Sequence, residues 1–134
     1  MRMILGGIVL LVLAGIAWVR LAPHDTARWH QPVRFNQNTD FSGGAVRVAE
    51  AGPDALARAD RYMRELDRTV VLAGSVQEGR VTYVTRSKVF GFPDYTTIEV
   101  RDEQIRAWAR LRFGASDLGV NRDRLEKIPV FSET

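Results

Sequence analysis

The chain has 134 residues, of which 46% are hydrophobic and 26% charged, a composition typical of one folded domain rather than a disordered chain. It has no cysteine, which excludes disulfides, thiolate catalysis and cysteine-ligated zinc. Its formal net charge of +3 permits an anionic partner without requiring one, because so small a charge produces only a weak long-range field.

The first predicted element is a membrane segment. An uninterrupted apolar run covers residues 3–19. Arg20 can extend its charged end to the membrane surface, so that the two apolar residues after it lengthen the run to a spanning helix. We therefore expect residues 1–22 to be a membrane anchor, with the membrane as a partner through residues 3–22.

The same segment has an alternative interpretation as a cleaved secretory signal. Gly15, Ile16 and Ala17 provide small residues at the positions that a signal peptidase needs. The apolar run is longer than the core of a typical signal, about 7–15 residues, and a bulky Trp18 would follow the cut. The anchor is therefore the favoured interpretation.

The charges around this segment give a mixed signal about orientation. A short basic N-terminus normally stays in the cytoplasm and sends the remainder outward, whereas Arg20, Arg28 and Arg34 after the span oppose that arrangement. We expect a single-pass membrane protein with its domain on the outer, periplasmic side of the cytoplasmic membrane.

Residues 23–52 show no sustained period and are rich in turn-forming residues, which indicates a linker or a wrapping segment. Three aromatic residues favour wrapping: Trp29, Phe35 and Phe41. Residues 45–49 alternate weakly and are typical of a short edge strand.

The only two histidines, His24 and His30, fall in this segment. No cysteine or acidic cluster accompanies them, so we interpret them as solvated loop residues rather than metal ligands. Neither a metal nor a cofactor is expected.

A helix is predicted to begin at residues 52–54, where Pro53 takes the first helical position and Asp54 adds an acid to the first turn. Apolar residues then recur at helical spacing: Leu56, Ala59, Met63 and Leu66. After Asp67 the period changes to two, and strands are predicted at residues 69–73, 80–90, 95–101 and 104–113. Their short connections force neighbouring strands to be antiparallel.

A final short helix is predicted at residues 121–127, followed by a frayed tail from Val130. The predicted fold is α+β: an N-terminal transmembrane helix, then a small antiparallel sheet of three to five strands packed against one or two helices. The predicted divisions are the anchor 1–22, the linker or wrapping segment 23–52, the α+β domain 53–130 and the tail 131–134.

Side-chain alternation divides each predicted strand into a core side and a cation-bearing side. In the last strand the core side begins with Ile105, and Thr96, Ile98 and Val100 are the inward set of the strand before it. If the opposite sides coincide, they form one cationic face, with Glu99 as its single carboxylate. Its candidate binding residues are Arg86, Lys88, Arg101, Arg106, Trp108, Arg110 and Arg112.

This cationic face has two interpretations. One is an ordinary solvated sheet face with polar outward positions. The other is a docking surface for an anionic lipid headgroup, a polysaccharide or an acidic protein, because arginine pairs bidentately with phosphate and carboxylate. Nucleic acid is not expected as a partner, because a domain outside the cytoplasm would rarely meet it.

Two stretches carry a family resemblance: residues 85–94, which read TRSKVFGFPD, and residues 110–122, which read RLRFGASDLGVNR. Together they resemble the domain of unknown function 1499 family, uncharacterised bacterial and plastid proteins, over about residues 29–128. The resemblance implies membrane attachment or export and no assigned activity. The motif residues are Phe90, Gly91, Phe92, Asp94, Gly114, Ser116, Asp117, Gly119, Asn121 and Arg122.

We expect a non-catalytic binding or scaffold domain of the cell envelope. No catalytic residue is assigned, because the chain after His30 has neither histidine nor cysteine to activate a nucleophile. The alternative is a small carboxylate-dependent hydrolase that uses Asp94 and Asp117. The binding hypothesis expects Arg86, Arg110 and Arg112 on one exposed face, and the hydrolase hypothesis expects the two aspartates to converge in a pocket.

Overall fold

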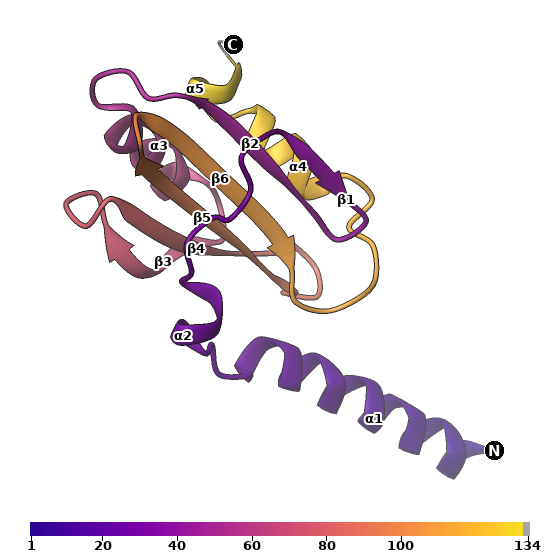
Figure 1. Cartoon of the computed structure of the whole chain (residues 1–134). Coiled ribbons are helices and arrows are strands. Elements are labelled where there is room, and N and C mark those ends of the chain that lie inside the picture. The colour runs from indigo at the N-terminus through magenta and orange to yellow at the C-terminus, as the bar shows by residue number, and fades with distance from the viewer. Residues whose placement is uncertain (133–134) are drawn as a thin grey trace.

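The computed structural model describes residues 1–132 and confirms the α+β class (Figure 1). The helices and strands, in chain order, are α1 (Arg2–Leu21), α2 (Thr26–Trp29), β1 (Thr39–Phe41), β2 (Gly44–Glu50), α3 (Ala55–Glu65), β3 (Thr69–Ser75), β4 (Arg80–Arg86), β5 (Pro93–Arg101), β6 (Gln104–Leu111), α4 (Val120–Glu126) and α5 (Pro129–Ser132).

Helix α1 extends away from the rest of the molecule, at the end of the sheet where β6 ends (Figure 1). None of its residues is buried. By length and composition it can cross a membrane, and a signal sequence near an N-terminus has the same properties. The chain therefore has one N-terminal apolar helix of membrane-spanning length.

The sheet has six antiparallel strands in the order β1-β2-β6-β5-β4-β3. This is slightly more than the three to five predicted. The segment that was expected to be a weak edge strand is β2, which lies inside the sheet between β1 and β6. Because β1 and β2 belong to this sheet, the predicted boundary between residues 52 and 53 falls inside the folded unit.

One face of the sheet packs against α3, α4 and α5 and forms the main core. The predicted alternation is confirmed here: Ile98, Ile105, Ala107 and Ala109 all face this side and are fully buried. Burying one large aliphatic side chain stabilises a fold by roughly 1.5–3 kcal/mol. Helix α3 contributes Leu56, Ala59 and Met63, three of the four residues of its predicted apolar stripe, as buried core residues.

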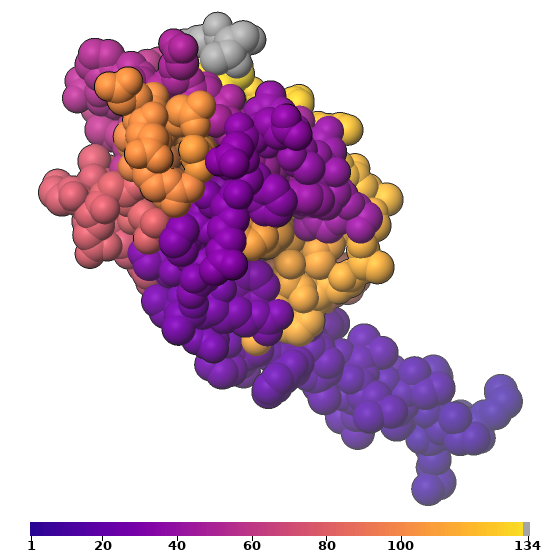
Figure 2. Space-filling view, viewed as in Figure 1, coloured from indigo at the N-terminus to yellow at the C-terminus, as the bar shows by residue number. Residues whose placement is uncertain are grey.

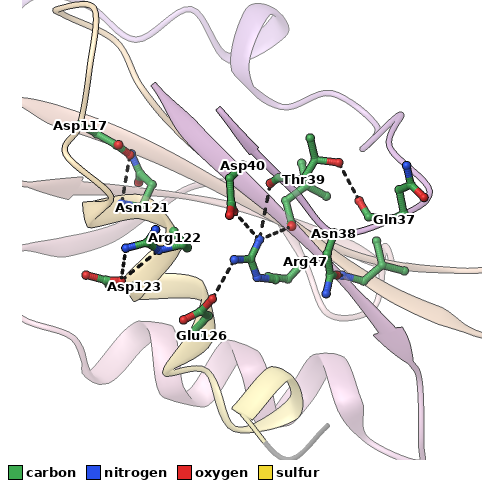
Figure 3. A network of polar contacts seen from close by, with 12 residues as sticks. Gln37, Asn38, Thr39, Asp40, Arg47, Asp117, Asn121, Arg122, Asp123 and Glu126 are labelled. Carbon is green, nitrogen blue, oxygen red and sulfur yellow. Dashed lines mark hydrogen bonds and ion pairs between the residues drawn. The ribbon is translucent and has the colours of Figure 1, made fainter. Parts of the chain in front are cut away.

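Buried Arg47 connects the β1–β2 hairpin to α4 (Figure 3). One guanidinium nitrogen lies 2.7 Å from Asp40 Oδ1 and the other lies 2.8 Å from Glu126 Oε1. Both carboxylates are partly exposed, so their desolvation cost is smaller than that of a fully buried pair. The two ion pairs fix the position of α4 over β2.

The opposite, outer face of the sheet is covered by residues 23–38, which we call the covering segment (Figure 2). Trp29 stacks on Tyr95 with ring centroids 3.9 Å apart and planes 7° apart. Farther along, the Val33 N–H donates to the Glu99 carboxylate, and the Val33 carbonyl accepts from Arg101 at 2.9 Å. The segment therefore wraps, as its aromatic residues predicted.

The predicted frayed tail is wrong for its first residues. Val130 and Phe131 are each only 8% exposed, because α5 packs their side chains into the main core. Residues 133–134 of that prediction lie outside the described residues.

Candidate functional site

Arg110 is the central cation of the outer face, and it is buried beneath the covering segment. Its Nη1 donates to Thr97 Oγ1 at 2.9 Å and its Nη2 donates to the Trp29 carbonyl. Its guanidinium carbon lies 4.0 Å from the centroid of the Trp108 ring. Burial lowers the pKa of Arg110 to about 9, so the group remains charged at neutral pH. This arginine holds the covering segment rather than facing solvent.

The expectation of one exposed cationic face is therefore wrong for Arg110, at 7% exposure, and for Arg106, at 6%. Arg101 lies 3.6 Å from the Glu99 carboxylate and also bonds the covering segment. Arg112 donates to the Pro23 carbonyl and to the Tyr95 hydroxyl, both at 3.1 Å. The predicted alternation was correct, but the covering segment packs over the polar side of the strands and contacts Arg101, Arg110 and Arg112.

The two aspartates of the hydrolase hypothesis line one cavity of about 330 Å³. Asp94 Oδ2 accepts from Asn121 Nδ2 at 3.1 Å and lies 3.6 Å from Arg124 Nη1. Burial raises the pKa of Asp94, while Arg124 and Asn121 act in the opposite direction. These contacts join the two stretches that carry the family resemblance.

Asp117 has a structural task in the same cavity. Its two carboxylate oxygens accept from the backbone N–H groups of Gly119, at 2.9 Å, and Asn121, at 3.1 Å (Figure 3). Gly119 adopts φ +81° where α4 begins, a conformation that favours glycine. Because both oxygens bond the backbone, Asp117 shapes the turn into α4.

A second cavity, of about 440 Å³, lies where α1 meets β3 and β4. We call it the basic groove. Four cations and no carboxylate line it, together with two valines, a serine and a glycine: Arg20, Arg68, Val70, Val84, Arg86, Ser87, Lys88 and Gly91. Within residues 1–132, none of these four cations forms an ion pair.

Neutral carbonyl oxygens orient the arginines of the basic groove. Arg20 Nη2 donates to the Val89 carbonyl at 2.8 Å, and Arg68 Nε donates to the Arg86 carbonyl at 3.1 Å. Arg86 Nη1 donates to the Gly91 carbonyl at 2.9 Å. Carbonyls position a guanidinium without neutralising it, so the positive charge of the groove is uncompensated.

Gly91 shapes one wall of the basic groove. Its φ is +72°, and a Cβ atom at this position would lie 3.0 Å from both Cγ and Nε of Arg20. A side chain would therefore be strained in this backbone conformation and would press on Arg20. The glycine of the first motif is explained by this close approach.

His24 supports Arg86 from the covering segment. Its Nε2 lies 3.1 Å from Arg86 Nη2, and its Nδ1 lies 2.6 Å from the Tyr95 hydroxyl oxygen. Because a guanidinium only donates, Nε2 accepts and the neutral ring carries its proton on Nδ1. Burial, reinforced by Arg86 and Arg112, lowers the pKa of His24.

His30 also contacts the sheet, through Thr82 Oγ1 at 2.8 Å from its Nδ1. Both histidines are half-buried, so the interpretation as solvated loop residues was wrong. Sequence reasoning found Arg86 and Lys88 of the basic groove but missed His24, Arg68 and the role of Arg20. Arg20 and Val89 are 69 residues apart in the chain, and no local pattern links them.

The remaining motif residues lie in the β4–β5 hairpin and in the stretch that runs from the end of β6 into α4. Phe90 and Phe92 are 49% and 41% exposed on the β4–β5 hairpin, and Ser116 Oγ accepts from the Leu118 N–H at 3.2 Å within its own turn. Gly114 has φ +101°, and exposed Arg122 pairs with Asp123 at 3.3 Å. The motif thus builds one end of the sheet.

Comparison with known proteins identifies a family. Searches of curated proteins and of solved structures each find no match. A family model described as "Protein of unknown function (DUF1499)" matches residues 24–129, which include the covering segment from His24 onward, all six strands and α4. The match covers well over half of the chain, and the protein belongs to this family.

Proposed function

We propose that the protein is a membrane-anchored, non-catalytic binding domain whose basic groove holds the anionic headgroup of a lipid. The observation that carries the proposal is the set of four uncompensated cations around an apolar-walled cavity. The docking function first assigned to the whole sheet face thereby moves to the end of the sheet beside α1.

The chemistry of the groove favours a phosphate-bearing group. Arginine offers paired N–H donors that match two oxygens of a phosphate, and Arg68 and Arg86 both line the groove. Val70 and Val84 supply an apolar surface next to these donors. A volume of about 440 Å³ lies within the range of small-molecule sites, roughly 300–1,000 Å³.

The position of Arg20 favours a lipid over a polysaccharide or an acidic protein. This residue is in the last turn of α1, the helix of membrane-spanning length, and its side chain lines the groove. A ligand in contact with Arg20 is therefore at the level of lipid headgroups when α1 crosses a bilayer.

The test uses full-length protein purified in mild detergent and exposed to equal amounts of phosphatidylglycerol and phosphatidylcholine. Retained lipid is counted by native mass spectrometry. We expect retention of phosphatidylglycerol in preference to phosphatidylcholine, and loss of roughly tenfold or more of this preference in the Arg68→Gln/Lys88→Gln variant.

The matched control is Arg34→Gln/Arg61→Gln, which removes the same charge from two exposed side chains that do not line the groove. This control should retain phosphatidylglycerol like the wild type. Equal retention of both lipids by the wild type, or equal losses in the two variants, would overturn the proposal.

A second candidate function is a carboxylate-dependent hydrolase, favoured by the cavity that Asp94 and Asp117 share. Its weakness is that both oxygens of Asp117 already bond backbone amides. Hydrolysis of soluble esters and phosphoesters by the wild type, abolished in Asp94→Asn with the fold intact, would favour this candidate over lipid binding.

A further inference from the structure

The β4–β5 hairpin carries exposed apolar side chains at its tip. Val89 is 70% exposed, and Phe90 and Phe92 are 49% and 41% exposed. Three large apolar residues within four positions form a surface that a soluble domain normally covers. Lys88 lies immediately before them and is also exposed.

A second loop adds to this surface. Leu118, in the connection between β6 and α4, is 90% exposed, and Val120, the first residue of α4, is 50% exposed. Phe92 and Val120 line the same cavity, so the hairpin and this connection are neighbours. The exposed apolar side chains of the hairpin and of this connection lie at the same end of the sheet, and we call them together the apolar tip.

Contacts with α1 fix where the apolar tip lies. Arg20 donates to the carbonyls of Val89, at 2.8 Å, and Phe90, at 3.3 Å. The hairpin backbone is thus within one arginine side chain of the end of α1. The neighbouring helix residues are themselves exposed, Trp18 at 63% and Leu21 at 80%.

We propose that the apolar tip inserts into the interfacial layer of the same phospholipid bilayer that α1 crosses. Val89, Phe90 and Leu118 enter the boundary between headgroups and acyl chains, where aromatic and aliphatic side chains are stabilised. Lys88 remains at the level of the phosphates. The domain then rests on the membrane at two points, the helix and the tip.

The bilayer is the favoured occupant because of its continuity with α1. A helix of 20 residues with no buried side chain requires an apolar environment along its length. The apolar tip begins beside the end of that helix, so one bilayer covers both surfaces. The inference depends on the apolar side chains and on α1, and it does not depend on headgroup selection by the basic groove.

The absence of cysteine in the chain permits single labels in the full-length protein. Val89→Cys and Leu118→Cys would each carry an environment-sensitive fluorophore in vesicles of phosphatidylcholine and phosphatidylglycerol. Gln77→Cys is the control, because Gln77 is exposed and lies in the β3–β4 turn, at the other end of β4 from the hairpin. Nitroxide groups on lipid acyl chains and aqueous iodide serve as the two quenchers.

We expect lipid nitroxides to quench the labels at Val89 and Leu118 several-fold more strongly than the label at Gln77, with iodide showing the reverse order. Because the fluorophore is itself apolar, a second variant adds Phe90→Ser to Val89→Cys and should lose most of the lipid quenching. Arg68→Gln/Lys88→Gln in the Val89→Cys background should keep it, which separates this proposal from headgroup binding.

Iodide access at Val89 equal to that at Gln77 would overturn the proposal. A second outcome would also overturn it: protection from iodide that grows with the protein-to-lipid ratio and is not accompanied by lipid quenching. A second copy of the chain would then cover the tip.

Discussion

Arg110 and Arg68 are both arginines that donate to backbone carbonyls, yet their surroundings differ completely. Arg110 lies inside the outer layer, between Trp29, Trp108 and Thr97. Arg68 is exposed and lines a cavity together with three other cations. Neither has a carboxylate partner, but the first is enclosed by protein groups, whereas the second lies at an open cavity.

The comparison shows that the position of an arginine on a strand face does not reveal its role. Alternation put Arg86 and Arg110 on the same side of the sheet, and the strand register agrees, because Tyr95 pairs with Arg110 and with Val84, two residues before Arg86. What divides them is the covering segment, which lies over Arg110 and leaves the groove open at the end of α1. The following predictions test this division, beginning with the cover itself.

Trp29→Ala should be the most destabilising change, because it removes the ring that stacks on Tyr95 beneath the covering segment. A buried tryptophan truncated to alanine costs about 3–5 kcal/mol of unfolding free energy. Urea denaturation of the full-length protein in detergent, monitored by circular dichroism, measures this loss of unfolding free energy. Trp18→Ala, at an exposed site on α1, is the control and should change stability by less than about 0.5 kcal/mol.

Arg110→Ala should cost about 2–3 kcal/mol, since it leaves the Trp29 carbonyl and Thr97 without their charged donor. Arg68→Ala, measured in the same denaturation experiment, should cost less than about 0.5 kcal/mol, as expected at an exposed site. Similar losses of unfolding free energy in the two variants would contradict the distinction between Arg110, which holds the covering segment, and Arg68, which lines the groove.

Gly91→Ala should cost about 1–2 kcal/mol, because alanine is strained at φ +72° and its Cβ would press on Arg20. It should also weaken retention of phosphatidylglycerol in native mass spectrometry, by displacing a cation of the groove. Gly52→Ala is a fair control, since no atom lies within 4 Å of its added Cβ. A Gly91→Ala variant with wild-type stability and full retention of phosphatidylglycerol would contradict the role of Gly91 in the wall of the basic groove.

The smallest effect concerns pH. Burial lowers the pKa of His24 and of His30 in the folded state, so below the ordinary histidine pKa of about 6.5 the unfolded chain binds more protons than the folded chain. Stability should therefore fall as the pH drops from above this value through the folded pKa values. In denaturation midpoints between about pH 8 and 5, His24→Gln should show a shallower decline than wild type, and an unchanged slope would exclude His24 as a contributor.

Local periodicity predicted much of the fold. The alternation of β5 and β6 assigned Ile98, Ile105 and Ala107 to the core, because a pleated strand with one apolar side has a single way to face its helices. The stripe on α3 was equally informative. Both signals depend on neighbours a few residues apart, which a sequence displays directly.

The contacts of the covering segment and the basic groove could not be predicted, for the opposite reason. Val33 is held through its backbone N–H and carbonyl by Glu99 and Arg101, and backbone bonds leave no side-chain pattern. Arg20 and Arg68 reach the groove through contacts with residues far along the chain. The two motif stretches were recognisable together, but nothing in their residues indicated that α1 would contact the first stretch.

The covering segment also limits how far the domain can travel. Only residues 22–28 separate the end of α1 from buried Trp29, and Ala22 is itself buried at 3% exposure. Even fully extended, these residues span at most about 25 Å. If α1 stays in a bilayer, as we propose, so short a tether keeps the domain at the membrane surface, and any ligand must reach it there.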